Sequence, residues 1–277
     1  MRRMWLTASL LVLSSCAQRG EVLSPIESPA TSRRFEVSTT VLENSSHGPS
    51  LCLGVLLSSF PPQCGGVPVA GWNWDMVDGE RRAAGTIWGR YRVVGTFDGA
   101  TFALTERPGT YEQPEVPADV ELQPGCPEPA AGWERPRPAD TTEANLQAAI
   151  AAAQAEPDFA GLWTVGQTQE GDVSAAVLNV AFTGGVDGRI SELREVWGGA
   201  LCVVQRRRSI AELERIRTEA TELIRERGIT LLSADADEVR GVVALEVVWF
   251  EPNDQAVFDS RFGDGAVVMS ARLRPVQ

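Results

Sequence analysis

Short runs of hydrophobic residues separated by turn signals occupy the first half of the chain, and runs with helical spacing appear only in the second half. Between positions 35 and 112 the runs show no helical period, which is typical of β-strands. Asp98 and Gly99 separate two alternating runs, and this dipeptide is a strong hairpin signal. The predicted strands span residues 35–42, 51–57, 67–74, 91–97 and 101–105.

Five strands without an intervening helix predict a small antiparallel barrel. In strand pattern the segment over 35–112 resembles the OB-like barrels. Within it, Cys52 and Cys64 enclose an apolar run and two prolines, which together predict a buried strand closed by a stiff turn. Trp72 and Trp74 are two residues apart, so on a strand both rings would point to one face, as a core layer or as a stacking platform.

The second half of the chain contains an internal repeat. Each copy consists of a strand, a helix that ends in an aromatic residue and a glycine, and a second strand. Two such units predict a ferredoxin-like α+β sandwich, in which helices cover one face of a single antiparallel sheet. The first copy spans 177–183, 187–197 and 198–204, and the second spans 242–250, 254–262 and 263–269.

Two more helices are predicted from capping signals and apolar spacing. An alanine-rich helix over 144–155 follows Thr141 and Thr142, either of which is a suitable N-cap. Between the two copies, apolar side chains recur at helical spacing after Ser209, which fits a capping box with Glu212. The expected fold class is α+β, with an OB-like barrel followed by a ferredoxin-like sandwich that carries one extra helix.

A proline-rich segment separates the two predicted folded parts. Eight prolines lie between residues 108 and 138, which excludes a central strand or a helix and predicts an extended linker. The expected division is a barrel domain over 35–112, a linker over 113–140 and an α+β domain over 141–277.

A basic start, an apolar run and a cysteine motif follow one another at the amino end. The run is too short for a membrane-spanning helix and has the length of a signal peptide. It ends in Leu13-Ser14-Ser15-Cys16, which resembles the lipobox of bacterial lipoproteins. The resemblance implies cleavage before Cys16 and a thioether-linked diacylglycerol on its sulfur.

The same resemblance implies where the protein resides. Residues 1–15 are then a signal peptide, and residues 16–34 form a lipidated flexible tether on the extracytoplasmic face of the cell membrane. The alternatives are an ordinary secretory signal with a coincidental cysteine, or a buried first helix.

The chain is acidic, and this restricts its partners. Its formal net charge is −12, and loss of Arg2 and Arg3 with the signal peptide takes it to −14. Such a charge argues against nucleic acid and against peripheral adhesion to anionic lipid, so anchoring is expected to come from the acyl group. The sequence has no lysine, which excludes a Schiff-base or phosphate-loop lysine.

Four cysteines remain besides Cys16, an even number that predicts two disulfides in an exported protein. Three pairings are possible. The favoured one joins Cys52 with Cys64, which are close in sequence, and Cys126 with Cys202, which would attach the linker to the second domain. A four-cysteine zinc site is the alternative, but the spacings lack the short C-x-x-C knuckle. No metal and no cofactor is expected.

Candidate binding residues lie in the first domain. His47 is the only histidine, and it lies in a turn-rich loop as either a surface residue, a general base or a metal ligand. Ser58 or Ser59 with His47 and Asp75 supplies the residue types of a hydrolase triad, although no Gly-x-Ser-x-Gly surrounds either serine. The aromatic residues are either core side chains or a face for sugar or peptide. The candidate binding set is His47, Trp72, Trp74, Asp75, Trp88 and Tyr91.

Two charged clusters stand out in the second domain. The run of arginines at 206–208 is either a solvated turn or a contact for an acidic partner or a phosphate. Asp235, Asp237 and Glu238 supply the ligand types of calcium, but the D-x-D-x-D-G loop is absent.

Together these features predict a membrane-anchored envelope lipoprotein that binds or scaffolds another envelope component without catalysing a reaction. Whether the chain is an enzyme stays open, because a cell-wall carbohydrate-binding protein or an envelope hydrolase could use the region of His47, Trp72, Trp74 and Asp75. The second domain also resembles the ferredoxin-like prodomains and inhibitor domains of secreted proteases, which implies a protease inhibitor or folding helper. The expected partners are the membrane, through Cys16, and an envelope protein or cell-wall glycan, but not nucleic acid.

Overall fold

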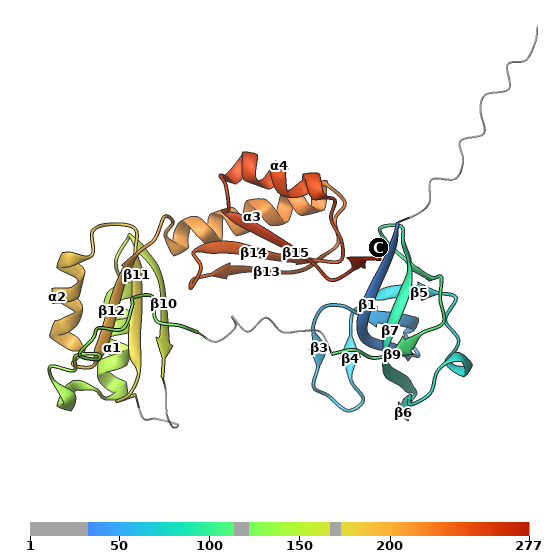
Figure 1. Cartoon of the computed structure of the whole chain (residues 1–277), viewed down its shortest axis with the longest axis horizontal. Helices are drawn as coiled ribbons and strands as arrows, with labels where there is room; N and C mark the ends of the chain where they lie inside the picture. Colours follow the sequence, from blue (N-terminus) through green and yellow to red (C-terminus); the bar gives the residue numbers. More distant parts are fainter. Residues whose placement is uncertain (1–32, 114–121, 167–172, 277) are drawn as a thin grey trace, which may run out of the picture. The chain divides into compact units, whose positions relative to one another are not determined.

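The computed structural model describes residues 33–113, 122–166 and 173–276 (Figure 1). The predicted signal peptide, Cys16 and the predicted tether up to residue 32 lie outside the described residues, and so does part of the predicted linker. The described residues form an α+β structure with four α-helices and a larger number of strands. Within this part of the chain, no helix is long and apolar enough to cross a membrane.

Five strands of the first domain close into a barrel. Their order is β1-β2-β5-β8-β7, and β7 pairs with β1 to complete the ring. The pairing of β5 with β8 is parallel and the others are antiparallel, so the barrel differs in this one pairing from the fully antiparallel one predicted. The barrel strands are β1 (Arg34–Asn44), β2 (His47–Cys52), β5 (Val67–Ala70), β7 (Thr86–Phe97) and β8 (Phe102–Leu104).

The predicted strands are confirmed in place but not in length. The second ends at Cys52, where the chain leaves the barrel to form a hairpin of β3 (Leu56–Leu57) and β4 (Gln63–Cys64). The third ends at Ala70, and a short 3₁₀ helix, η1 (Trp74–Met76), follows it. Strand β7 begins five residues earlier than predicted because it pairs with nearly the whole of β1.

The predicted Asp98-Gly99 hairpin is confirmed. Phe97 pairs with Phe102 across the turn, and the Asp98 carboxylate accepts hydrogen bonds from the backbone N–H groups of Thr101 at 2.8 Å and Ala100 at 2.9 Å. Because these bonds favour the charged carboxylate, they lower the pKa of Asp98.

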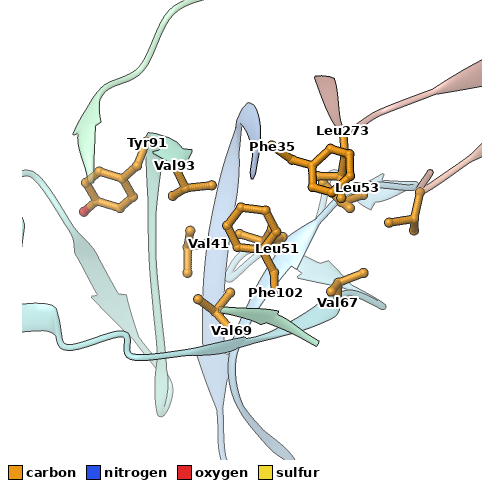
Figure 2. Close-up of a cluster of buried hydrophobic side chains, with 11 residues drawn as sticks. Phe35, Val41, Leu51, Leu53, Val67, Val69, Tyr91, Val93, Phe102 and Leu273 are labelled. Atoms are coloured by element: carbon orange, nitrogen blue, oxygen red, sulfur yellow. The ribbon is translucent and has the colours of Figure 1, made fainter. Parts of the chain in front are cut away.

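Aliphatic and aromatic side chains from every barrel strand fill the interior (Figure 2). Gly95 is required where β7 passes β8, because a Cβ atom at this position would lie 2.2 Å from the Ala103 carbonyl oxygen. The core consists of Phe35, Val41, Leu51, Leu53, Val67, Val69, Tyr91, Val93, Phe102, Val248 and Leu273.

Two members of that core come from the second predicted domain. Val248 and Leu273 are fully or almost fully buried among the barrel side chains. The last strand, β16 (Arg274–Pro275), pairs with β1 beside them, and β6 (Arg81–Ala83) and β9 (Gly109–Thr110) pair with β7. The first domain is therefore completed by one residue from within the second domain, by Leu273 and by the strand that ends it.

The second domain contains two copies of one order of elements, and each copy is larger than the unit that the sequence pattern suggests. Each copy reads helix, strand, strand, helix, strand, with the first two strands antiparallel and the last two parallel. The first copy contains α1 (Glu143–Gln154), β10 (Phe159–Val165), β11 (Val177–Phe182), α2 (Asp187–Val196) and β12 (Ala200–Gln205). The second contains α3 (Ile210–Glu226), β13 (Leu231–Asp237), β14 (Val242–Val247), α4 (Pro252–Phe262) and β15 (Val267–Ala271).

The two copies form separate three-stranded sheets, β10-β11-β12 and β13-β14-β15. This differs from the single ferredoxin-like sheet predicted, because each copy supplies a first strand that the hydrophobic pattern does not reveal. With that strand and a preceding helix, each copy has its own core. Leu178, Phe182 and Trp197 are buried in the first core, and Leu245 and Phe258 in the second.

Shared irregularities support a true repeat. Strands β10 and β13 both shift register near their first residues, between Phe159 and Gly161 and between Leu231 and Ser233. Helix α1 is capped by Thr142, whose side chain accepts a hydrogen bond from Asn145 N–H, and α3 by Ser209. The open choice between Thr141 and Thr142 is thereby decided.

The described part of the linker packs onto the first copy. Gly125 N–H donates to the buried Asn179 side chain at 2.8 Å, and Trp163 Nε1 donates to the Gln123 carbonyl at 2.9 Å. Cys126 is bonded to Cys202 of β12, and Trp133 packs beside this disulfide. The segment from 122 to 137 is therefore a cover for the sheet face opposite α1 and α2.

Both favoured disulfides, Cys52–Cys64 and Cys126–Cys202, are present, and they yield a test. We expect non-reducing peptide mapping to recover these two pairs and no other. The double variant Cys126→Ala/Cys202→Ala is expected to lose about 2–5 kcal/mol of unfolding free energy in urea denaturation, because the cover is no longer tied to β12. Free thiols at these positions in exported protein would contradict the pairing.

Candidate functional site

The side chains of strand β7 alternate between the interior and the outer face of the barrel. Tyr91 and Val93 belong to the interior, whereas Trp88 and Arg90 alternate with them and face outward. The register with β1 places Leu42 opposite Trp88. The outer face therefore carries aromatic, aliphatic and cationic groups side by side.

The loop between β2 and β5 lies against this outer face. We call its residues 53–63 the flap. The Cys52–Cys64 disulfide closes the flap at its base, with a Cα–Cα distance of 5.6 Å, and packs with Leu42 and Trp88. Strands β3 and β4 of the flap pair only with each other in the described structure.

The flap exposes most of its apolar side chains, contrary to the buried strand that the sequence predicts. Leu53 is buried, but Val55 is 72%, Leu57 53% and Phe60 73% exposed. Four of the six large hydrophobic side chains that are exposed in the described residues belong to the flap, the fourth being Leu56. The prediction fails because the chain leaves the barrel sheet at Cys52.

A cavity of about 530 Å³ lies between the flap and the barrel wall. This volume falls in the range of small-molecule sites. One side of it is apolar and aromatic, and Phe60 meets Trp88 edge to face at 5.8 Å between ring centroids. Its lining includes Thr40, Leu56, Leu57, Ser58, Ser59, Phe60, Asp78, Arg81, Trp88 and Arg90.

Two arginines of this cavity lack a carboxylate partner among the described residues. Arg81 places its guanidinium 5.8 Å from the Phe60 ring centroid and 5.4 Å from that of Trp88, and Arg90 lies 3.8 Å from that of Tyr111. Their sequence neighbours Arg82 and Arg92 do form ion pairs, with Glu80 and Glu36. The cavity lining has two arginines and one acidic residue, Asp78, and neither arginine forms an ion pair with it, which favours an anionic or polar ligand group.

Three of the predicted aromatic residues meet elsewhere, at the barrel core. Trp72 lies 5.2 Å from Trp74 and 5.4 Å from Tyr91 between ring centroids. The two tryptophans follow β5 on a turn and on η1 instead of on a strand, and both are half-buried against the core. Trp74 Nε1 donates to Glu43 at 2.6 Å.

Tyr91 is nearly completely buried, and Figure 2 shows it beside Val93 at the barrel core. Gly89 makes room for it, because a Cβ atom at position 89 would lie 2.3 Å from the Tyr91 hydroxyl oxygen. Burial raises the pKa of Tyr91, and the negative charges of Glu80 and Asp78 raise it further. Neither this hydroxyl nor Trp72 Nε1 has a hydrogen-bond partner among the described protein atoms.

His47 and Asp75 make local contacts. His47 Nδ1 lies 2.8 Å from the Gly48 carbonyl oxygen, and its Nε2 lies 3.1 Å from the Asn44 side-chain nitrogen. Both ring nitrogens therefore contact residues of the β1–β2 turn. Asp75 is exposed on η1. Ser59, the other residue type of a triad, donates its hydroxyl to the Pro61 carbonyl.

The charged clusters of the second domain connect its two copies. Arg206 donates to the Val239 carbonyl at 3.1 Å and lies over the Trp163 ring. Glu238 accepts a hydrogen bond from Leu162 N–H at 3.0 Å. Among the described residues, no group of three or more histidine, cysteine, aspartate or glutamate side chains is arranged to hold a metal ion.

Comparison with known proteins adds nothing to this geometry: no protein-family model matches the chain, and no curated protein matches its sequence. The candidate site therefore rests on the flap, Trp88, Arg81 and Arg90. Of these only Trp88 belongs to the predicted binding set. The run between Cys52 and Cys64 was visible as apolar, but its exposure depends on where β2 ends.

The Tyr91 environment yields a test by pH titration. Because the folded pKa lies above the ordinary value of 10.0, this group contributes stability that is fully present below pH 10 and is lost as the pH rises through the folded pKa. The chain has two tyrosines, so the difference between the absorbance titrations of wild type and Tyr91→Phe isolates Tyr91. A Tyr91 midpoint at or below 10 would contradict its burial beside acidic groups.

Proposed function

We propose that the protein is a lipid-anchored binding protein of the bacterial envelope, and that the flap with the adjacent barrel wall is its binding surface. The observation that carries this proposal is the group of exposed apolar side chains beside two uncompensated arginines. Each large apolar side chain kept in water forgoes about 1.5–3 kcal/mol of burial free energy. Contiguous exposed apolar groups with a polar rim are typical of interaction sites.

The construction of the flap also supports binding. A disulfide at its base and contacts with Leu42 and Trp88 hold it in place. A loop held in one conformation loses less conformational entropy when a ligand binds, which favours affinity. The exposed side chains are thus presented by a supported element.

The barrel topology supports the same location. In chain order β2 and β5 are the second and third barrel strands, and the flap is inserted between them. We infer that the barrel is OB-like, and OB-like barrels bind their ligands on the face of strands two and three. This support is one of fold analogy.

The alternatives have less support from the geometry. A glycan-stacking face would use Trp72 and Trp74, but both rings pack against the barrel core and against Tyr91. A hydrolase would need His47 as its general base, yet both ring nitrogens of His47 contact residues of the β1–β2 turn. The protease-inhibitor hypothesis depended on one ferredoxin-like sandwich, whereas the two copies form separate sheets.

The anchor is tested by mass analysis of the amino-terminal peptide from membrane fractions. We expect a diacylglycerol adduct on Cys16 as the first residue of the mature protein. The variant Cys16→Ser is expected to lack the adduct and to leave the membrane fraction. An unmodified Cys16 peptide that still contains residues 1–15 would contradict the lipoprotein assignment.

The binding surface is tested by photo-crosslinking in native envelopes. A benzoylphenylalanine replaces Leu57 in the flap, and the control replaces Ile190, an exposed apolar residue of α2. We expect a discrete envelope component, whether protein, glycan or lipid, to be crosslinked from position 57 and not from position 190. Equal or absent crosslinking at both positions would overturn the proposed binding surface.

A further inference from the structure

The side chains of the flap that line the cavity are also exposed to solvent on their other side. Val55, Leu57 and Phe60 are each more than half exposed, and all lie within six residues of one disulfide-closed hairpin. A ligand enclosed by the cavity would leave much of this apolar surface in water. We call these three side chains the apolar tip; their exposed surface fits an occupant that is larger than the cavity and apolar where it meets them.

The arginines at the base of the flap specify the chemistry of that occupant. Arg81 packs on Phe60 and Trp88, so its guanidinium lies where the apolar tip meets the barrel wall. Arg90 lies on the same cavity wall, and neither forms an ion pair within the described residues. An apolar tip with guanidiniums at its base matches a layer of hydrocarbon beneath phosphate groups.

We propose that the flap docks on the phospholipid bilayer that carries the anchor, with its apolar tip between the acyl chains and Arg81 and Arg90 at the phosphates. This inference rests on the proposed function, because it assigns an occupant to the same surface. A docked flap would hold the barrel against the membrane. It adds a second membrane contact to the single one, through Cys16, that the sequence predicts.

Chain length allows this contact. The 17 residues that follow Cys16, up to and including Arg33, span at most about 60 Å when fully extended, so an acylated Cys16 keeps the barrel within that distance of the bilayer. Tethering makes docking intramolecular and raises the effective concentration of the flap at the surface. Docking of the flap can therefore occur in the anchored protein even if the same contact is too weak to bring an unanchored protein to the membrane.

The acidity of the chain does not oppose a local contact of this kind. At about 0.15 M salt, charges farther than about 8 Å from the surface are largely screened. The cavity beside the flap is lined by Arg81 and Arg90 and by one acidic residue, Asp78, so its local charge is not negative, and insertion of apolar groups does not require a positive protein.

The test uses the acylated full chain in vesicles of phosphatidylethanolamine and phosphatidylglycerol. Leu57→Cys carries an environment-sensitive NBD label, and the control label is at Ile190→Cys on α2. The four other cysteines outside the anchor form disulfides, so the new thiol is the labelled one. We expect lipid-borne quenchers to quench the label at 57 and not the label at 190.

Exposed positions also allow variants that leave the fold intact. In the labelled chain, Phe60→Ser is expected to lower the ratio of docked to undocked flap about tenfold, the loss that corresponds to one buried aromatic group. The double variant Arg81→Gln/Arg90→Gln is expected to lower it as well. A label at 57 that is as exposed to water as the label at 190 would overturn membrane docking.

The two proposals fail in different ways. If the label at 57 stays in water while crosslinking from 57 captures one envelope protein or glycan, the flap is a binding surface and its occupant is not lipid. If position 57 neither enters the bilayer nor crosslinks, both proposals are overturned. Crosslinking to phospholipid together with quenching would support both.

Discussion

The pairing of β1 with β7 is the constraint on which the first domain depends. Ten consecutive residue pairs, from Arg34 with Thr96 to Glu43 with Ile87, join the two longest barrel strands without a register shift. Because side chains alternate across a strand, this one register assigns every residue of β7 to the core or to the outer wall. It buries Tyr91 and Val93 and turns Trp88 outward, where the Cys52–Cys64 disulfide packs on it. A shift of one residue would exchange the two faces and remove the wall against which the flap rests.

In the second domain each of the two copies has its own hydrophobic core. Two copies of one helix–strand–strand–helix–strand unit have separate sheets and separate apolar clusters. The first copy needs a cover for its second sheet face, and the described linker residues provide it through Cys126 and Trp133. The second copy returns Val248 and Leu273 to the barrel core. The linker and the second copy thus make contacts with parts of the chain that the sequence pattern predicts to be separate.

The sequence correctly predicted those features that depend mainly on residues close to one another in the chain. Asp98-Gly99 formed its hairpin, Ser209 capped its helix, and the cysteines paired as spacing and position favoured, because each depends on residues nearby or on the even cysteine count. Strands β10 and β13 escaped prediction, since Phe159–Val165 contains an internal glycine and Leu231–Asp237 alternates with acids. The candidate site was predicted only in Trp88. The exposure of the flap follows from the end of β2 at Cys52, and Arg81 and Arg90 stand out because neither forms an ion pair among the described residues.

We expect the flap to be covered by an envelope component when the protein is anchored in the envelope. Hydrogen exchange of the backbone amides of residues 53–63 tests it most directly, with the acylated protein in native membranes compared with the unacylated Cys16→Ser protein in solution. We expect slower exchange in the flap of the anchored protein and unchanged exchange in α2. Identical exchange of the flap in the two forms would contradict it.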